Sequence, residues 1–486
     1  MASSVTEQDG VDVDVAIVGM GAAGLSAAIE AHDHGATVVV LEKAPEEHAG
    51  GQTRVSGGTW FDNRDPDAAA TYLRALCGDR PVPEAIVEVW AVETARNSAW
   101  VASLGAELGV MPFTAAYPEL PGHDCFGGLV HVAPTWGMGR LFDTLLAAAR
   151  RRGIELRFDT RATGLVAAPG SGAILGVDTE HRGQAVRFRA RRGVVLATGG
   201  FQADPELLRE HVGLVDAQQW GSPYNTGDGH RLAMKVGAGL WHMQNHFPMV
   251  GLRMDGYAAG MATFPPADGF IYVGPDGSRF VDEQVPTRHG HAFHHGRFEQ
   301  FPSEPMWVVF DERTRAAGPF CRPFEEGPYG WSQLVDGYRW SPDNCAEIER
   351  GWISTADSLE QLAKTMGIDP AGLVATVARY NEACGRGVDE QFGREPATLV
   401  PIDRPPYYGF RWGPVLNFTC GGPRRNERAQ VLDAFGQVIP RLYCAGEMSM
   451  SYSRCFDSGM PIADALAFGR IAGRQSAAED PISDVS

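Results

Sequence analysis

The strongest pattern of apolar and polar positions lies in residues 13–42. An uninterrupted apolar run over 13–18 predicts a buried parallel strand, which leads directly into a glycine-rich turn. Apolar residues at helical spacing over 22–34 predict a helix, and a second apolar run over 37–41 predicts another buried strand. Glu42 closes that run. The segment is therefore predicted to be a strand–turn–helix–strand unit that ends in an acidic residue.

Each residue type in this unit has a physical role at a phosphate-binding turn. Gly19 permits a tight turn, Gly21 lets the backbone approach a pyrophosphate, and Gly24 lets the helix pack closely on the strand. The start of the helix offers unpaired N–H groups and the positive end of its dipole to the phosphates. Glu42 is placed to accept hydrogen bonds from a ribose hydroxyl. Together these residues predict a dinucleotide site.

The remaining pattern divides the chain into further regions. Residues 49–58 are too rich in glycine for a regular element, and we predict a loop whose bare backbone can lie against a ligand. Residues 65–152 show mostly helical spacing, and 153–200 return to short apolar runs that predict strands. The chain closes with a predicted strand near 442–447 and a predicted helix over 460–474.

Composition and charge exclude several classes of function. With 486 residues the chain is long enough for two or three domains, and its net charge of −18 argues against nucleic acid or an anionic membrane as the main partner. We find no run of 18 apolar residues and no export signal at the start, so we expect no membrane span and a cytoplasmic location. The eight cysteines form no Cys-x-x-Cys pair, and no metal site is predicted.

Four separated blocks of the sequence resemble the flavoprotein family of fumarate reductases, succinate dehydrogenases and 3-ketosteroid dehydrogenases. The blocks are residues 19–42 with 50–58, residues 196–201 with 225–229, residues 277–283 with 376–381 and 387–394, and residues 442–447 with 457–464. They follow the family's order over nearly the whole chain. The resemblance implies that the dinucleotide is FAD.

The same resemblance implies an α/β fold, in which a Rossmann-like FAD-binding domain carries an inserted substrate or capping domain of α+β type. We assign residues 1–238 and 412–486 to the FAD-binding domain, with 65–152 as its mostly helical insertion. Residues 239–411, which hold many of the Trp, His, Tyr and Pro residues, are assigned to the substrate or capping domain.

The family pattern also implies a set of cofactor-binding residues. Glu447 would hold the ribitol, and the helix start at Met460–Ile462 would face the flavin pyrimidine ring, where negative charge is stabilised by a helix N-terminus. The full set is Gly19, Gly21, Ala23, Gly24, Glu42, Lys43, Gly51, Thr53, Ser56, Gly57, Gly58, Ala162, Thr198, Gly199, Asp228, Gly446, Glu447, Gly459, Met460 and Ile462. Membrane-complex members attach their flavin through a His where this chain has Gln52 and Thr53, so we expect non-covalent FAD.

Two departures from the family pattern narrow the range of expected substrates. Fumarate reductases carry a His and an Arg at the positions that match Phe418 and Phe456. Two groups that would bind a dicarboxylate are thereby replaced by phenyl rings, and desolvating a carboxylate against such rings is costly. The late block resembles the 3-ketosteroid dehydrogenase branch more closely, although Phe456 stands where those enzymes have a Tyr. We expect a mid-sized, partly apolar substrate.

The resemblance implies removal or addition of two hydrogens across a C–C bond next to a carbonyl, with hydride passing through flavin N5 and a side chain moving the proton. Arg288 or His289 is the predicted proton donor or acceptor, oriented by Glu283; a solvated His-rich loop is the alternative. Tyr408 and Ser458 are candidate oxyanion donors, together with Tyr407 and Tyr452, and a hydroxyl bonded to backbone is the alternative for each. Trp241, His242 and His246 line the substrate pocket or belong to the core.

Two other functions remain open from the sequence. One is a flavin-dependent isomerase or hydratase without net redox change, and the other is an electron-transfer subunit of a larger complex. The chain has no second strand–glycine-turn–helix unit for NAD(P)H. Electrons must therefore be exchanged with another donor or acceptor, such as oxygen, a quinone or a second flavoprotein.

Overall fold

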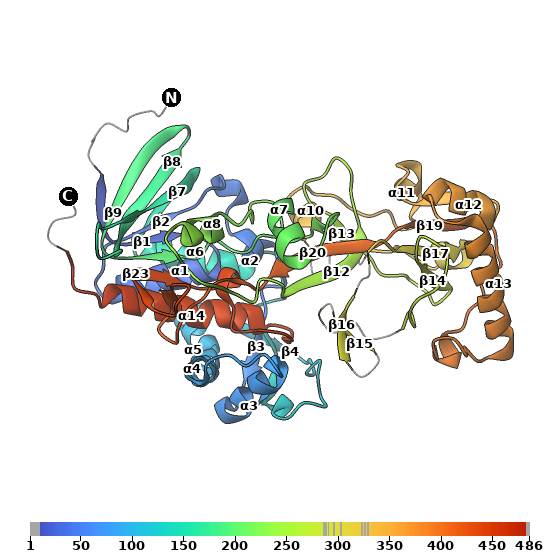
Figure 1. Ribbon diagram of the computed structural model, residues 1–486, viewed down its shortest axis with the longest axis horizontal. Coiled ribbons are helices and arrows are strands. Elements are labelled where there is room, and N and C mark those ends of the chain that lie inside the picture. Colours follow the sequence, from blue (N-terminus) through green and yellow to red (C-terminus); the bar gives the residue numbers. More distant parts are fainter. Residues whose placement is uncertain are drawn as a thin grey trace. The chain divides into compact units, whose positions relative to one another are not determined.

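The computed structural model describes residues 10–284, 289, 291–294, 297–301, 304–321, 324, 327 and 330–482 (Figure 1). The chain divides into two compact units. Unit 1 comprises residues 1–215, 221–247 and 418–486, and unit 2 comprises residues 216–220 and 248–417. The substrate or capping domain predicted for residues 239–411 corresponds most closely to unit 2.

Unit 1 is built on an eight-stranded sheet in the order β22-β23-β9-β1-β2-β6, with β8 pairing with β9 and β7 with β8. Its strands are β1 (Val11–Val18), β2 (Val38–Leu41), β6 (Glu155–Arg157), β7 (Thr160–Ala167), β8 (Ile174–His181), β9 (Gln184–Leu196), β22 (Gln430–Leu432) and β23 (Val438–Cys444). β1 is parallel to both β2 and β9, and β23 is parallel to β9. The predicted α/β fold and the two buried strands around the first helix are confirmed.

The register of the parallel strands brings three turns to one edge of the sheet. Val18 pairs with Leu41 on one side and with Leu196 on the other, and Leu196 pairs in turn with Cys444. The residues that follow these strands therefore meet at the carboxyl edge, where open α/β sheets bind ligands. They include the glycine turn that begins at Gly19 and the Ala-Gly-Glu block that follows Cys444.

Two helices of the sheet layer pack against each other without intervening side chains. They are α1 (Ala22–Asp33) and α14 (Met460–Ala477), which lie side by side in Figure 1. A Cβ on Gly469 would lie 2.5 Å from the carbonyl oxygen of Ala23, and a Cβ on Gly473 would lie 2.3 Å from that of Ala27. Glycine at these two positions of α14 thus permits the close packing of α14 on α1.

Residues 65–152 contain the predicted helices and also two strands. The helices are α3 (Pro66–Cys77), α4 (Glu84–Ala95), α5 (Asn97–Ser103) and α6 (Arg140–Arg151). β4 (Leu108–Met111) and β5 (Phe126–Val132) join β3 (Trp60–Asn63) in a three-stranded sheet with β5 in the middle. Figure 1 shows α3, α4 and α5 grouped together, and we call residues 65–152 the helical insertion.

The prediction that residues 49–58 form no regular element was wrong for part of that segment. α2 (Gly51–Val55) is a short helix that follows Gly50, whose φ of 108° is a left-handed conformation favourable only for glycine. The helix has a tertiary role, because Thr53 Oγ1 accepts a hydrogen bond of 2.9 Å from the backbone N–H of Ala22 at the start of α1. Unit 1 also holds α7 (Pro205–Leu207), α8 (Asp228–Lys235), β11 (Leu240–Trp241) and β21 (Gly422–Pro423).

Unit 2 is of α+β type. One sheet has the order β14-β17-β19-β18, formed by β14 (Phe270–Val273), β17 (Trp307–Asp311), β19 (Tyr407–Arg411) and β18 (Ser354–Ala356). A second sheet has the order β10-β20-β12-β13, formed by β10 (Gln218–Gln219), β20 (Gly413–Thr419), β12 (His246–Leu252) and β13 (Met261–Ala262). A hairpin of β15 (His291–His294) and β16 (Arg297–Gln300) follows β14. The helices are α9 (Glu312–Ala316), α10 (Gly330–Leu334), α11 (Cys345–Glu349), α12 (Leu359–Met366) and α13 (Pro370–Arg386).

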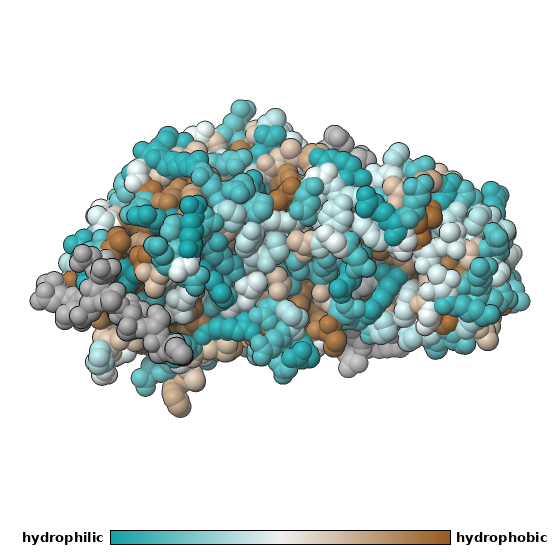
Figure 2. Space-filling model, turned by 90° about the horizontal axis from the view of Figure 1, so that it is seen from above, coloured by the Kyte–Doolittle hydropathy of each residue, from teal (hydrophilic) through white to brown (hydrophobic). Residues whose placement is uncertain are grey.

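Hydrophilic residues predominate on the face drawn in Figure 2, and hydrophobic residues are scattered over it in small groups. Within the described part of the chain, every helix is too short or too polar to cross a membrane.

Candidate active site

The glycine turn after β1 has the geometry that its sequence predicts. Gly19 has φ of 102°, and a Cβ there would lie 2.3 Å from the carbonyl oxygen of Ala197. A Cβ on Gly24 would lie 2.0 Å from the carbonyl oxygen of Gly19, so helix and strand could not approach as they do. Gly21 differs, because the nearest atom to its Cβ position is Thr53 Oγ1 at 3.5 Å. The backbone at Gly21 is thus accessible to a ligand at the N-terminus of α1.

Glu42 ends β2 beside this turn and is buried. Its Oε2 accepts a hydrogen bond of 3.1 Å from the N–H of Met20, and its Oε1 accepts one of 2.8 Å from the N–H of Ala44. Burial raises the pKa of this carboxyl group, and the backbone donors oppose the shift. Each carboxylate oxygen has a second acceptor position, so Glu42 retains capacity for a ribose hydroxyl.

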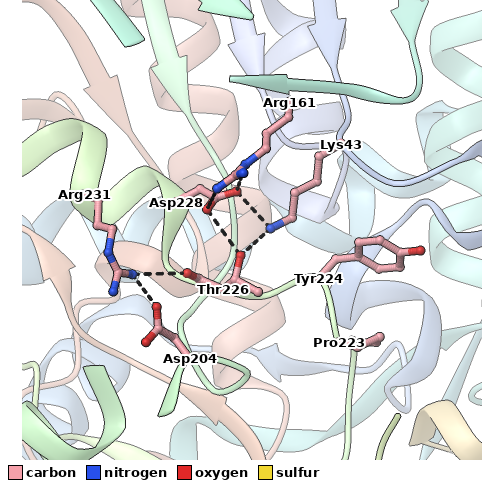
Figure 3. A pocket seen from close by; sticks show the side chains of 8 residues that line it. All are labelled: Lys43, Arg161, Asp204, Pro223, Tyr224, Thr226, Asp228 and Arg231. Carbon is pink, nitrogen blue, oxygen red and sulfur yellow. Dashed lines mark hydrogen bonds and ion pairs between the residues drawn. The ribbon is translucent and has the colours of Figure 1, made fainter. Parts of the chain in front are cut away.

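A pocket of about 500 Å³ lies beyond Glu42 at the same edge (Figure 3). It is lined by Lys43, Arg161, Asp204, Pro223, Tyr224, Thr226, Asp228 and Arg231. Lys43 and Asp228 belong to the predicted cofactor set, and Arg161 precedes Ala162, another member, which lies on β7 opposite Thr179. The adenosine end of the dinucleotide is therefore predicted to lie at this pocket.

The charges in this pocket compensate one another around Asp228. Lys43 Nζ contacts Asp228 at 3.0 Å and donates to Thr226 Oγ1 at 2.6 Å, while Arg161 binds both oxygens of Asp228 at 3.0 and 3.2 Å. Burial acts to raise the pKa of Asp228, but the hydrogen bonds and positive charges of Arg161 and Lys43 outweigh it and hold the pKa below its usual value. The carboxylate is therefore ionised at neutral pH and fixes the start of α8.

Glu447 lies in the turn after β23 and is half-buried. Asn225 Nδ2 donates to its Oε2 at 3.2 Å, and the N–H of Thr419 donates to its Oε1 at 3.3 Å. Burial raises the pKa of Glu447 to about 8, against the effect of these donors. A Cβ on Gly200 would lie 2.4 Å from Glu447 Oε1, and one on Gly199, which has φ of 72°, would lie 2.9 Å from Asn225. The Thr198–Gly199–Gly200 turn is thus shaped around this carboxyl group.

The start of α14 completes the sheet edge. Gly459 is its N-cap, with φ of 74°, and a Cβ there would lie 2.6 Å from the N–H nitrogen of Phe61. Met460 is buried, and Ile462 stands in the first turn. Gly446 leads into the Glu447 turn, and a Cβ on it would lie 2.7 Å from the Cβ of Ala23. The predicted residues on α1, after β23 and at the start of α14 are therefore close together.

The turn that follows α2 holds the remaining predicted residues. Ser56 Oγ accepts a hydrogen bond of 3.1 Å from the N–H of Gly58, and a Cβ on Gly57 would lie 2.9 Å from the ring of Trp136. Gln52, which stands where a flavin-attached His would be, accepts a hydrogen bond of 3.2 Å from the N–H of Ser222. A Cβ on Gly51, which precedes Gln52, would have Asn225 as its nearest neighbour at 3.8 Å.

An aromatic cluster occupies the positions at which the family's dicarboxylate enzymes differ. The centroids of the Phe418 and Phe456 rings are 5.2 Å apart, and Phe247 is 5.5 Å from Phe418 and 5.9 Å from Phe456. Phe456 also contacts Tyr452 at 6.1 Å. Phe418 is 8% exposed and Phe456 is 1% exposed, so neither position could hold an unpaired charge at low cost. We call Phe247, Phe418 and Phe456 the phenyl cluster.

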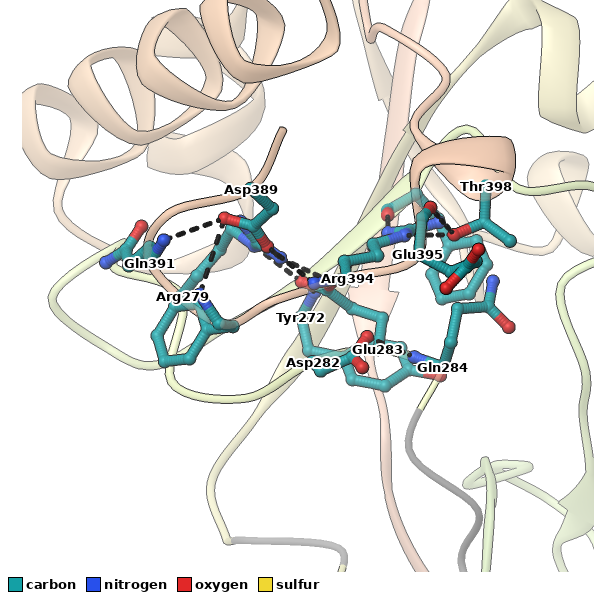
Figure 4. Close-up of polar contacts among 12 residues, drawn as sticks. Tyr272, Arg279, Asp282, Glu283, Gln284, Asp389, Gln391, Arg394, Glu395 and Thr398 are labelled. Atoms are coloured by element: carbon teal, nitrogen blue, oxygen red, sulfur yellow. Dashed lines mark hydrogen bonds and ion pairs between the residues drawn. The ribbon is translucent and has the colours of Figure 1, made fainter. Parts of the chain in front are cut away.

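Glu283, predicted to orient the proton-transferring side chain, lies in a buried ionic network of unit 2 (Figure 4). Arg279 donates to both of its oxygens at 2.7 Å, and Arg394 donates to Oε2 at 3.1 Å. Asp389 accepts a further bond from Arg279 at 3.0 Å. The backbone N–H of Tyr272 adds a bond of 3.3 Å. These contacts give Glu283 a structural role, and its catalytic role stays a prediction.

Of the two proton-transfer candidates, the structure describes only His289. Arg288 lies outside the described residues. His289 is half-buried with φ of 51°, and removal of its ring from water lowers its pKa to about 4. At neutral pH the imidazole is therefore neutral, and so low a pKa makes it a weak base.

The candidate oxyanion donors have partners within the chain. Tyr408 donates to Glu312 at 2.7 Å, and Tyr452 donates to the carbonyl of Met460 at 2.7 Å. Ser458 uses its backbone N–H to bind Asp457 at 2.6 Å. Tyr407 lies half-buried on β19. The Tyr452 hydroxyl, which is bonded to backbone, matches the structural alternative, whereas that of Tyr408 is bonded to a side chain. The oxyanion roles stay predictions.

The predicted pocket-lining residues form a separate group near Ser449 and Met450. His242 stacks on Trp241 with centroids 4.4 Å apart, and its Nδ1 contacts the carbonyl of Met450 at 3.2 Å. Burial lowers the pKa of His242 to about 4. Trp241 donates to Ser449 Oγ at 3.3 Å, and His246 contacts the carbonyl of Gln244 at 3.0 Å.

Several residues at these sites were not identified from the sequence. Tyr224, Thr226 and Arg161 line the nucleotide pocket, and each stands next to or within a predicted block, which was the available signal. Phe247 of the phenyl cluster follows His246, but a single Phe after a His carries no pattern. Arg394 ends the Gly-Val-Asp-Glu-Gln-Phe-Gly-Arg block, yet nothing in its spacing indicated that it would bind Glu283.

Comparisons with known proteins agree with this geometry. Residues 14–459 match the family described as the FAD binding domain. The chain is 29% identical to the 3-oxosteroid 1-dehydrogenase of Mycobacterium tuberculosis, over 95% of this chain and 97% of that protein. It is 28% identical to the fumarate reductase (cytochrome) of Shewanella frigidimarina, over 96% of this chain and 77% of that protein. The solved structure of a 3-ketosteroid delta1-dehydrogenase from Sterolibacterium denitrificans has a TM-score of 0.77 at 23% identity, covering 96% of this chain and 99% of that one.

The predicted family, fold class and cofactor are thereby confirmed. The matched region includes the glycine turn, the nucleotide pocket, the Glu447 turn and the first residues of the late block. FAD is the cofactor, and the residues at the carboxyl edge of the unit 1 sheet fit it. The chain belongs to the FAD-binding domain family and is an FAD-dependent oxidoreductase that acts on CH–CH groups.

Proposed function

We propose that this enzyme dehydrogenates or reduces a C–C bond next to a carbonyl in a mid-sized, partly apolar substrate, using FAD that is held without a covalent bond. The observation that carries the proposal is the contact between Phe418 and Phe456, whose ring centroids are 5.2 Å apart. Beside these buried rings an apolar group loses no hydration that it needs, whereas a carboxylate would lose its hydration without gaining a partner.

The other steps of the proposed reaction depend on different parts of the chain. Bound FAD supplies a centre that accepts or donates a hydride. The N-terminus of α14 favours negative charge beside it, because the helix dipole directs its positive end there. The phenyl cluster excludes water and charge from the substrate side. His289 or Arg288 moves the proton.

The non-covalent character of the cofactor follows from Gln52. Its amide replaces the nucleophilic imidazole of the covalent flavoproteins and is bonded to the backbone of Ser222. Acid precipitation of the protein should therefore release all of its yellow colour into the supernatant. Colour that stays with the pellet would contradict this part of the proposal.

The substrate proposal is tested by anaerobic reoxidation. The flavin of the purified protein is reduced with dithionite, and cyclic enones of increasing size or fumarate are then added. We expect reoxidation by an enone and none by fumarate. Reoxidation by fumarate at a comparable rate would overturn the substrate proposal.

The mass of the product decides between the remaining reaction types. A change of two hydrogens supports the proposed reaction. No change, or a gain of one water, would identify the isomerase or hydratase alternative, and failure of all small substrates with rapid transfer to a protein acceptor would identify an electron-transfer subunit. We further propose an electron donor or acceptor other than NAD(P)H, and a cytoplasmic location.

A further inference from the structure

A hydrogen-bond chain connects the helical insertion to the turn before α14. Tyr72, on α3, donates from its hydroxyl to Oδ2 of Asp457 at 2.7 Å. Oδ1 of Asp457 accepts from the N–H of Ser458 at 2.6 Å, and its backbone carbonyl accepts from the N–H of Met460 at 3.2 Å. Asp457 thus contacts the insertion through its side chain and the first residue of α14 through its backbone.

A second chain reaches the same helix start from α4. Trp90 donates from its indole N–H to the hydroxyl of Tyr452 at 3.1 Å, and that hydroxyl donates to the carbonyl of Met460 at 2.7 Å. The rings of Trp90 and Tyr452 meet edge to face at 6.1 Å, and Tyr452 contacts Phe456 at the same distance. Two helices of the insertion are therefore linked to Met460, α3 through Asp457 and α4 through Tyr452.

The first of these chains depends on one fully buried carboxyl group. Asp457 has no exposed surface, and besides Tyr72 it accepts a bond of 2.7 Å from the N–H of Ala116, in the same insertion. Burial raises its pKa, and the Tyr72 hydroxyl and the two backbone donors oppose that shift. A buried acceptor that loses one of these donors is destabilised where it stands, so the turn would shift to regain a partner.

We infer that Tyr72 and Asp457 are a positioning pair, through which the helical insertion fixes the Phe456–Gly459 turn. Neither is a catalytic residue of the proposed reaction. The pair acts through Phe456, which belongs to the phenyl cluster, and through Met460, which begins α14. The inference rests on the proposed function, because that proposal places the substrate against the phenyl cluster and the flavin beside the start of α14.

The test compares the FAD-loaded variants Tyr72→Phe, Asp457→Asn and their double mutant. Tyr443→Phe is the matched control, because Tyr443 is a buried tyrosine of unit 1 that donates to a different carboxylate, Glu479, at 2.6 Å. We expect each test variant to raise KM for the active enone about tenfold and to shift the visible flavin band, since small displacements of a binding wall have effects of this order. The double mutant should have the same KM as Asp457→Asn alone, because Asp457→Asn already removes the bond that Tyr72→Phe removes.

Two results would overturn the positioning role. One is an unchanged KM and flavin band in Tyr72→Phe, and the other is full additivity in the double mutant. If Asp457→Asn does not fold, Tyr72→Phe decides alone, since it removes a single oxygen atom. A Phe456→Arg variant, compared with Phe456→Leu, separates this inference from the proposed function. If Phe456→Arg loses activity with the enone while Tyr72→Phe leaves KM unchanged, only the positioning role fails; if Phe456→Arg is as active with the enone as Phe456→Leu, the substrate proposal itself fails.

Discussion

The rings of Phe418 and Phe456 meet with their centroids 5.2 Å apart and their planes inclined at 48°. One ring comes from β20 and the other from the turn before α14, so the fold brings together two positions that are remote in sequence. Aromatic pairs at this centroid distance contribute stability beyond the area they bury. The pair thus forms a buried apolar contact where related dicarboxylate enzymes are expected to carry two cationic side chains.

The activity of Phe456 variants should depend on the charge of the new side chain more than on its size. Phe456→Leu keeps an apolar side chain and should retain the value of kcat/KM with an enone within about tenfold. Phe456→Arg places a guanidinium at a position that is 1% exposed, and it should lower kcat/KM more than about a hundredfold, since an unpaired buried charge costs several kcal/mol. Steady-state kinetics with thermal unfolding measures both effects. An arginine variant that is as active as the leucine variant would contradict an apolar substrate.

Substitution of two glycines of the first turn should have different effects, one on flavin binding and the other on folding stability. Gly21→Ala should fold normally, because its φ of −80° suits alanine and its Cβ would be 3.5 Å from the nearest atom. The methyl group would instead obstruct the pyrophosphate, so bound flavin should fall about tenfold, or about 1.4 kcal/mol in affinity. Gly24→Ala should lose about 3 kcal/mol or more of folding stability, because its Cβ would lie 2.0 Å from the Gly19 carbonyl oxygen.

The control for both variants is Gly385→Ala in α13. This glycine has no neighbour within 4 Å of its Cβ position, and alanine is preferred to glycine within a helix by roughly 1 kcal/mol. Gly385→Ala should therefore keep its flavin and gain slightly in stability. Flavin content is measured by visible absorbance and stability by denaturant unfolding of the flavin-free protein. Equal flavin loss in Gly385→Ala would show that the assay reports general damage.

The parts of the site that the sequence predicts are those encoded over short distances. The turn from Gly19 to Gly24 is one such part, because strand, turn and helix follow one another in sequence. Its glycines lie where the local backbone leaves little or no room for a side chain or must stay open to a ligand. The helix that begins at Met460 is another, since Gly459 and Pro461 mark its start. Short-range pattern therefore suffices for the nucleotide-binding unit, whereas the fold class was implied by the resemblance of four separated blocks to a known family.

Contacts between segments that are distant in sequence could not be predicted from the sequence pattern. The insertion's bond from Tyr72 to Asp457 joins positions that are 385 residues apart, and the bond from Arg394 to Glu283 joins positions 111 apart. Neither pair stands out by spacing or composition. The short helix at 51–55 was missed for the same reason, because Thr53 is held by its bond to Ala22 on α1 and not by local propensity.

Glu283→Gln should act mainly on stability. Arg279 and Arg394 both bind this carboxylate in a fully buried site, and loss of its charge leaves two guanidinium groups poorly compensated. Breaking such an ion pair typically costs about 3–5 kcal/mol. The surface control Glu390→Gln removes a pair with Arg386 at 3.8 Å and should cost less than about 1 kcal/mol. A Glu283→Gln variant with normal urea unfolding but little activity would instead support the predicted catalytic role.

Glu447 should give the flavin-free protein a recognisable pH dependence. Its pKa is raised by burial from 4.5 to about 8, so the folded state binds a proton that the unfolded state has lost over that range. Its contribution to stability is therefore full below pH 4.5 and disappears as the pH rises through 8. Across this window the free energy of unfolding of the wild-type protein should fall by a few kcal/mol relative to that of Glu447→Gln. Each tenfold difference in proton affinity between the folded and unfolded protein corresponds to about 1.4 kcal/mol. Urea unfolding of both proteins at several pH values measures the difference, with Glu390→Gln as the control that should follow the wild type. Parallel curves for wild type and Glu447→Gln would show that this carboxyl group is not protonated in the folded protein.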